Sequence, residues 1–105
     1  MKSSQKKAGS RSLQAKYVLR LYISGSTSKS AQAVENIKRV CEQHLKNRHE
    51  LKVIDIYQQP NLARSEQIVA APTLIKRRPL PLRRLIGDLS NQENVLLGLD
   101  LRERA

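Results

Sequence analysis

Phenylalanine and tryptophan are absent from this chain of 105 residues, and its only aromatic side chains are Tyr17, Tyr22 and Tyr57. The hydrophobic core must therefore be built from Leu, Ile, Val and Ala. No apolar run approaches the length of a membrane-spanning helix, and no apolar stretch follows the early lysines as a secretory signal would require. We expect one cytoplasmic domain, since this length is enough for one modest core and too short for two.

Residues that often carry chemistry are also scarce. The single cysteine, Cys41, excludes an internal disulfide, and His44 and His49 lack the further ligands that a zinc site needs. The chain has no glycine motif that would cradle a phosphate, no nucleophile turn and no paired carboxylates. We therefore predict no enzyme activity, no cofactor and no structural metal.

Basic residues greatly outnumber acidic ones: 20 Lys and Arg against nine Asp and Glu give a formal net charge of +11. The excess favours anionic partners but does not choose between nucleic acid, acidic protein surfaces and membrane surfaces. Residues 1–16 contain five basic residues and no acid among Ser, Gly and Gln, which predicts a disordered basic tail. The folded domain is then expected over residues 17–105.

A second group of basic residues lies within the part of the chain that we expect to fold. Its neighbours are proline and leucine, whereas nucleic-acid readers commonly place aromatic residues there for base stacking, so RNA binding is not expected. A solvated basic rim beside a turn and a specific protein contact both stay open. The group consists of Lys76, Arg77, Arg78, Arg83 and Arg84.

The first half of the chain has the pattern of a β-α-β unit. Residues 17–24 and 51–56 are apolar runs that predict strands. Between them, apolar residues recur three or four apart from Ser30 to Leu45, which predicts an amphipathic helix. A helical crossover of this length predicts that the two strands are parallel. The first strand is expected in the centre of the sheet, because it is apolar on both faces except at Arg20.

The second half of the chain predicts a short helix, two strands and a final helix. Pro60 suits the first position of a helix over residues 61–70. The prolines that follow separate one extended stretch, over residues 71–76, from another over residues 83–87. The complete order, β-α-β-α-β-β-α, predicts a single α/β domain with the thioredoxin-like fold.

Local signals mark the last helix and the third strand. Ser90 with Glu93 three residues on forms a capping box, and Gly98 is expected to end the helix. Pro72 occupies the place where the thioredoxin-like fold usually has a cis proline. A cis bond between Ala71 and Pro72 is therefore our hypothesis.

Thioredoxin-like redox proteins carry a C-x-x-C pair between the first strand and the first helix. Here that place is Gly25–Ser30, which contains no sulfur and suits helix capping. Cys41 falls on the apolar stripe of the helix, where a buried core side chain is favoured over a reactive thiol. A thiol oxidoreductase is therefore the weakest of the functional hypotheses.

Several strings occur in order: YVLRLYISGST over 17–27, LKVID over 51–55, APTL over 71–74, and IGDLSN with LLGLDL over 86–101. Together they resemble the KaiB family of small clock proteins. The resemblance implies a non-enzymatic regulator that binds a KaiC-like ATPase and modulates its cycle, with KaiA or a histidine kinase as further partners. It also implies a fold switch between a resting homotetramer, with a rearranged C-terminal half, and a thioredoxin-like monomer that binds the ATPase.

The resemblance also implies contact roles for individual residues. Lys52, Lys76 and Arg83 match basic residues of the family that face the ATPase. Tyr17 matches a tyrosine near the tetramer contacts. We therefore expect the first three residues at the partner surface and Tyr17 at the oligomer interface.

Three further residues are expected to take part in the fold switch. Gly98 and Asp100 match the Gly-Leu-Asp string that helps to set the balance of folds, and Pro72 lies in the half that would rearrange. Other matches fail, because Gln32 and Gln67 stand where the family has basic residues, and the acidic tail of cyanobacterial members is missing. These departures keep a second function open: a KaiB-like stress-response regulator without a clock role, acting through a different protein partner.

Overall fold

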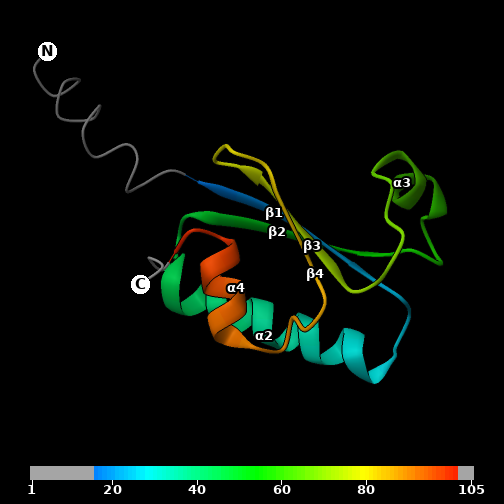
Figure 1. Cartoon of the computed structure of the whole chain (residues 1–105), viewed down its shortest axis with the longest axis horizontal. Coiled ribbons are helices and arrows are strands. Elements are labelled where there is room, and N and C mark those ends of the chain that lie inside the picture. Colours follow the sequence, from blue (N-terminus) through cyan, green and yellow to red (C-terminus); the bar gives the residue numbers. More distant parts are fainter. Residues whose placement is uncertain (1–15, 102–105) are drawn as a thin grey trace, which may run out of the picture.

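The computed structural model describes residues 16–101, so all but the last residue of the predicted basic tail lies outside the described residues. The described chain forms a four-stranded sheet with α2 and α4 on one face and α3 on the other (Figure 1). In chain order the elements are β1 (Tyr17–Ile23), α2 (Ser28–His44), β2 (His49–Asp55), α3 (Pro60–Ser65), β3 (Thr73–Arg78), β4 (Arg83–Ile86) and α4 (Gln92–Gly98).

The sheet has the strand order β2-β1-β3-β4, with β1 and β3 in the centre. β1 pairs with β2 in parallel and with β3 antiparallel, and β4 pairs antiparallel with β3. This topology confirms the predicted thioredoxin-like order and the predicted β-α-β unit, in which α2 is the crossover between the two parallel strands.

The face of the sheet beneath α2 and α4 carries the main core. Leu19 and Leu21 point to this side from β1, and Ile37 from α2 and Leu96 from α4 pack against them. Burial of each such side chain contributes about 1.5–3 kcal/mol to folding. The core is aliphatic, as the composition predicts, with these buried members: Tyr17, Leu19, Leu21, Ala33, Ile37, Val40, Cys41, Leu45, Leu74, Leu89, Val95, Leu96 and Leu99.

The opposite face of the sheet has a much smaller core beneath α3. Tyr22, Ile54 and Ile75 form it from three neighbouring strands, and Leu62 and Ile68 pack against it. The predicted helix here is shorter than expected, since α3 ends at Ser65. Gln67 adopts a left-handed conformation with φ 57°, and the Ile68 N–H bonds the Ala63 carbonyl at 2.9 Å, a closure that ends a helix.

The ends of the two longer helices are fixed by polar side chains. Thr27 caps α2, because its Oγ1 accepts the Ser30 N–H at 3.2 Å, which agrees with the capping role expected for this Ser and Thr cluster. The predicted capping box at Ser90 is wrong: Asn91 caps α4 and its Oδ1 accepts the Asn94 N–H at 3.1 Å. The Ser90 hydroxyl instead donates to Asp88, which places Ser90 in the preceding turn.

The structure confirms the prediction for Pro72 but differs from the prediction for Gly98. The Ala71–Pro72 bond is cis, as hypothesised, and the bonds before Pro79 and Pro81 are cis as well. Gly98 is the last residue of α4 and not the residue beyond it. Chain reversal after the helix occurs at Asp100, which has φ 61°.

Candidate functional site

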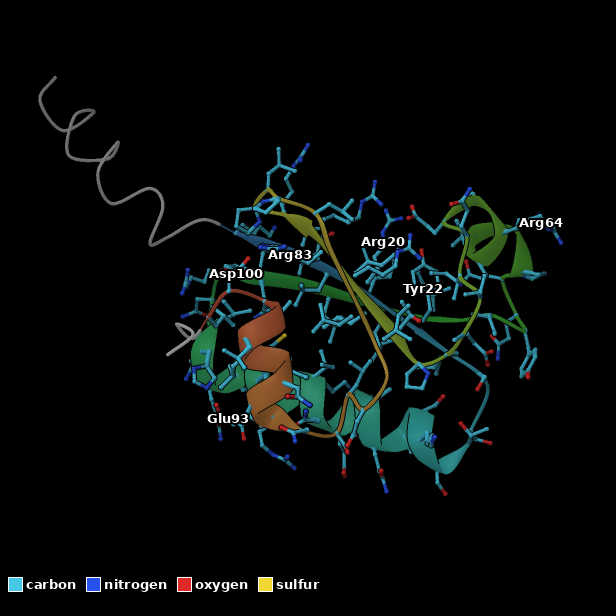
Figure 2. The ribbon with its side chains drawn as sticks, in the orientation of Figure 1. Arg20, Tyr22, Arg64, Arg83, Glu93 and Asp100 are labelled. Atoms are coloured by element: carbon cyan, nitrogen blue, oxygen red, sulfur yellow. The ribbon has the colours of Figure 1, made fainter. Side chains whose placement is uncertain are left out.

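The structure brings four of the expected site residues together where α4 ends against the sheet. Asp100 follows α4, Lys76 and Arg83 are paired across β3 and β4, and Tyr17 begins β1. Figure 2 shows Arg83 beside Asp100 at this end of the molecule, away from Arg20 and Tyr22. We call Tyr17, Lys76, Arg83 and Asp100 the Asp100 cluster.

The Asp100 carboxylate is the acceptor of this cluster. Its Oδ2 lies 3.3 Å from Lys76 Nζ and 3.2 Å from Arg83 Nε. The Lys76 side chain is only 2% exposed, so Asp100 neutralises an ammonium that has little access to water. Arg83 is 45% exposed and remains accessible from outside. The two pairs join the end of α4 to both strands of the β3–β4 hairpin.

Two opposing effects act on the pKa of Asp100. Partial removal from water raises the pKa, whereas hydrogen bonds from Arg83 and Lys76 and their positive charges lower it. The lowering effects together are larger, and the pKa of the Asp100 carboxyl lies below its usual value. Asp100 is therefore ionised at neutral pH and holds both cations.

The Tyr17 ring lies beneath Lys76. The Lys76 Nζ is 5.8 Å from the ring centroid, a distance at which a cation is attracted by the aromatic face. The Tyr17 hydroxyl donates to the Leu99 carbonyl at 3.5 Å. Burial raises the pKa of Tyr17, with Arg48 opposing the shift and Asp100 adding to it. Tyr17 is 7% exposed, so in this conformation it belongs to the core.

Gly98 lies directly against Leu85 of β4. A Cβ at this position would be 2.7 Å from Leu85 Cγ, so any side chain requires Leu85 to move. Glycine at this position avoids a clash with Leu85, but it weakens the helix by about 1 kcal/mol relative to alanine. Gly98 thus couples the position of α4 to the packing of β4.

Lys52 does not join the Asp100 cluster. In the parallel pairing of β1 with β2 it lies beside Arg20, on the face of the sheet that α3 covers, and its side chain is exposed. The predicted partner residues are thus divided: Lys52 is on one face and on the edge strand β2, whereas Lys76 and Arg83 are on the other face. Their contact with a partner stays a prediction.

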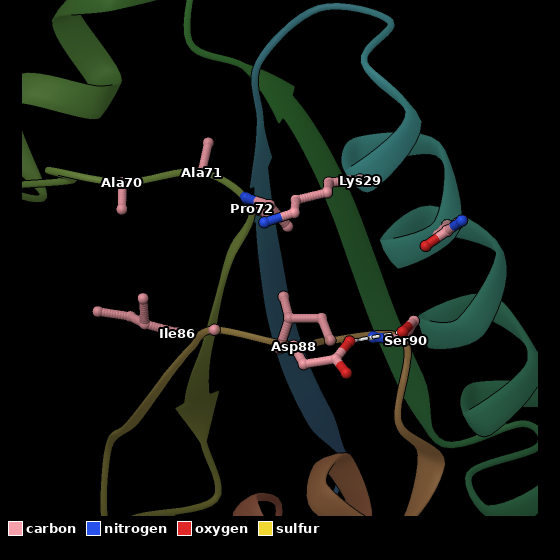
Figure 3. A pocket seen from close by; sticks show the side chains of 10 residues that line it. Lys29, Ala70, Ala71, Pro72, Ile86, Asp88 and Ser90 are labelled. Atoms are coloured by element: carbon pink, nitrogen blue, oxygen red, sulfur yellow. Dashed lines mark hydrogen bonds between the residues drawn. The ribbon is translucent and has the colours of Figure 1, made fainter.

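A pocket of about 610 Å³ lies between the start of α2 and the loops around Pro72 and Asp88 (Figure 3). Thioredoxin-like redox proteins have their cysteine pair in this region. Here the lining includes Lys29, Gln32 and Ser90, and Cys41 lies elsewhere, with burial and then Glu42 raising its pKa to about 11. The pocket therefore has no thiol to oxidise, and Cys41 is a buried thiol, as expected.

Two features of the structure were missed at the level of the sequence. The buried Asn36 side chain donates to the Leu89 carbonyl at 2.7 Å and ties α2 to the loop before α4. Arg20, Arg77 and Arg84 converge on Glu66, and this cluster depends on the register of three strands.

Among residues 16–101, no group of three or more His, Cys, Asp and Glu side chains is placed to hold a metal, and no helix has both the length and the apolar character needed to cross a bilayer.

Residues 20–101 match the sequence profile of the KaiB domain. The chain is 51% identical over 84 residues to the circadian clock protein KaiB3 of Synechocystis sp., which covers 80% of this chain and 82% of the relative. The chain belongs to the KaiB family. A second KaiB, the circadian clock oscillator protein of Thermosynechococcus vestitus, is 49% identical over 85 residues, covering 81% of this chain and 79% of the relative.

Solved structures confirm the fold of this KaiB-family chain. The N-terminal domain of Synechococcus elongatus SasA superimposes with a TM-score of 0.66 at 23% identity, over 87% of this chain and 90% of that domain. The thioredoxin Deadhead of Drosophila melanogaster gives a TM-score of 0.68 at 9% identity, over 94% and 92% of the two chains. These likenesses establish the fold alone, whereas the KaiB relatives support a clock-related regulator.

Proposed function

We propose that this KaiB-family chain is a non-enzymatic regulator that binds a KaiC-like ATPase and modulates its phosphorylation or ATPase cycle. The observation that carries the proposal is the coincidence of a KaiB-domain match over residues 20–101 with a thioredoxin-like sheet. By the resemblance to the family, this is the form that binds the ATPase. KaiA or a histidine kinase would then meet the chain at a further surface.

The basic residues expected to contact the partner lie on both faces of the sheet, and this makes the proposal more specific. Lys52 and Arg83 are exposed, but they lie on opposite faces and opposite edge strands of the sheet, so one flat partner surface cannot cover both. Lys76 is buried behind Asp100 and reaches a partner only if that ion pair opens. Lys52 and Arg83 are therefore expected to contribute separately to partner binding.

Binding to the cognate KaiC-like ring tests the proposal, with surface plasmon resonance as the measurement in both nucleotide states of the ring. The variants are Lys52→Gln and Arg83→Gln, and Lys38→Gln on the exposed side of α2 is the matched control. We expect each of the two contact variants to lose about tenfold in affinity and the control to stay within about twofold. Absence of any complex with the wild-type chain in both nucleotide states would refute ATPase binding.

The fold switch is the second part of the proposal. Gly98, Asp100 and Pro72 lie in the half that would rearrange, and Gly98 weakens α4 while Asp100 ties its end to the sheet. A resting homotetramer would release a binding-competent monomer slowly. Light scattering after chromatography should then give a tetramer for the isolated chain, and a single monomeric species with a thioredoxin-like NMR spectrum would contradict the switch. Tyr17, which is buried here, would reach an oligomer interface only in the rearranged form.

A different partner is the alternative function. Gln32 and Gln67 are exposed and uncharged in this structure, so two basic groups expected for ATPase binding are missing. A KaiB-like stress-response regulator would then bind another protein and have no clock role. Affinity capture from the native cell followed by mass spectrometry distinguishes the two: recovery of a KaiC-like ATPase supports the first function, and its absence beside a reproducible other partner supports the second.

A further inference from the structure

Three arginines from three different strands converge on one residue, Glu66, which directly follows α3. Arg77 Nη1 of β3 lies 2.8 Å from Glu66 Oε2, and Arg20 Nη1 of β1 lies 3.8 Å from the same oxygen. Arg84 of β4 donates from Nη2 to the Glu66 carbonyl at 2.8 Å and from Nη1 to the Gln67 carbonyl at 3.4 Å. We call Arg20, Arg77 and Arg84 the arginine cluster.

The register of the sheet explains why these side chains meet. Arg20 and Arg84 are both paired with Ile75, one from each neighbouring strand, and Arg77 lies two residues beyond Ile75 on the same face. Ile75 belongs to the small core beneath α3, so the cluster lies at the border of that core. Figure 2 shows Arg20 beside Tyr22 on the side of the sheet toward α3.

The positive charge of the arginine cluster exceeds the negative charge that faces it. Three guanidinium groups face one carboxylate, which leaves two positive charges, and the exposed Lys52 lies beside Arg20 on the same face. Glu50, the acid that β2 carries on this face, lies 3.3 Å from Lys16 and pairs with that lysine. Glu66 therefore balances only part of the local charge.

The hydrogen-bond donors are also in excess. Each guanidinium has five N–H donors in a planar fork that suits two oxygens of one anion. Glu66 offers only its Oε2 to Arg20 and Arg77, and Arg84 bonds backbone carbonyls, which carry no net charge. A phosphate group carries close to two negative charges and several acceptor oxygens, so it matches both the residual charge and the fork geometry.

We propose that the arginine cluster is a binding site for a phosphate-class anion, which exchanges with the Glu66 carboxylate. The site uses neither Arg83 nor Lys76, whereas Lys52, the third proposed ATPase contact, lies beside Arg20 on the same face of the sheet. The exchange has a structural consequence: Glu66 and Gln67 are the residues through which the cluster holds the end of α3, and the apolar core there is small. Anion binding therefore loosens the segment over residues 60–68.

Titration of the full chain with inorganic pyrophosphate, followed by 15N NMR at constant ionic strength set with chloride, tests the site. Wild-type protein should show saturable shifts at Arg77, Arg84 and Gln67 and faster amide exchange over residues 60–68. Glu66→Gln should bind about fivefold more tightly, because the competing carboxylate is gone, and Arg77→Gln should bind about tenfold more weakly. Arg39→Gln on the exposed side of α2 is the matched control and should bind like wild type.

Several outcomes would overturn the proposal. Equal weakening in Arg77→Gln and Arg39→Gln would show attraction by net charge alone, and weaker binding by Glu66→Gln would show that Glu66 does not compete. Arg77→Lys, which keeps the charge but loses the fork, guards against misfolding and should bind with intermediate affinity. A phosphoserine peptide in parallel identifies the source of the phosphate: tighter binding of pyrophosphate supports a free ligand, and tighter binding of the peptide supports a phosphorylated protein segment.

Discussion

The two faces of the sheet are joined to their helices by different interactions. Thirteen buried residues form the core beneath α2 and α4, whereas three form the core beneath α3. The larger face is held by apolar contact, and the Asp100 cluster lies at its border. The smaller face depends more on the arginine cluster and on Glu66. The face with fewer buried contacts should open first, while the other sets the global stability of the fold.

Truncation of one leucine on each face should give the largest contrast. Leu96 of α4 is fully buried, so Leu96→Ala should lower the free energy of unfolding by about 2–5 kcal/mol. Leu62 of α3 is only partly buried, and Leu62→Ala should cost about 1 kcal/mol or less. Urea unfolding followed by circular dichroism measures both. Equal losses for the two variants would contradict the assignment of global stability to the α2 and α4 face.

The reactivity of Cys41 tests, without a mutation, how firmly α2 packs against the larger face of the sheet. Burial and the neighbouring Glu42 raise the pKa of this thiol to about 11, so little thiolate is present at pH 8. A disulfide reagent should therefore modify the native chain about a hundredfold more slowly than the chain unfolded in urea. Comparable rates in both states would show that α2 separates from the sheet readily.

Sequence patterns predicted the larger face better than the smaller one. Apolar periodicity predicts α2 and β1 because both bury a continuous stripe, and the helical crossover predicts the parallel pairing of β1 with β2. The end of α3 differs from the predicted one because it depends on a left-handed residue, Gln67, which is not glycine. Ser90 and Asn91 are both good capping residues, so the sequence does not distinguish them, and only the geometry identifies Asn91 as the cap of α4.

The sequence also predicts the candidate site only in part, because burial and side-chain contacts depend on the three-dimensional arrangement of the strands. Matching to the family pointed to Lys76, Arg83 and Asp100, and these residues do meet in space. Nothing in the sequence indicated that Lys76 would be buried, because it lies within a run of three basic residues that suggests a solvated surface. The arginine cluster was missed because it forms only when β1, β3 and β4 pair in their observed register.

Low pH should lower the stability of the folded chain, because it protonates Asp100 at the border of the larger face. The pKa of this carboxyl is lowered in the folded chain, so its contribution to stability is complete above the unfolded pKa and is lost as the pH falls through the folded pKa. Asp100→Asn should cost about 1–2 kcal/mol at pH 7, because Lys76 then lacks a counter-charge. Unfolding curves at pH 7 and pH 3 measure both effects, and the difference between wild type and variant should shrink at the lower pH.

Asp88→Asn provides the comparison for that experiment. Hydrogen bonds from the Ser90 side chain and backbone lower the pKa of Asp88, but this carboxylate is exposed and pairs with no buried cation among residues 16–101. Its replacement should change stability less than that of Asp100 at pH 7. A larger effect for Asp88 would contradict the role given to the buried Lys76.

Removal of one hydroxyl on the smaller face should give the smallest effect, and one of opposite sign. Tyr22 is fully buried beneath α3, and its hydroxyl has no hydrogen-bond partner among the described residues. An unpaired buried hydroxyl costs free energy, so Tyr22→Phe should raise the free energy of unfolding by up to about 1 kcal/mol. Urea unfolding at pH 7 measures the gain. A loss of stability would show that the hydroxyl finds a partner, such as a buried water, and that the smaller face is better satisfied than its contacts indicate.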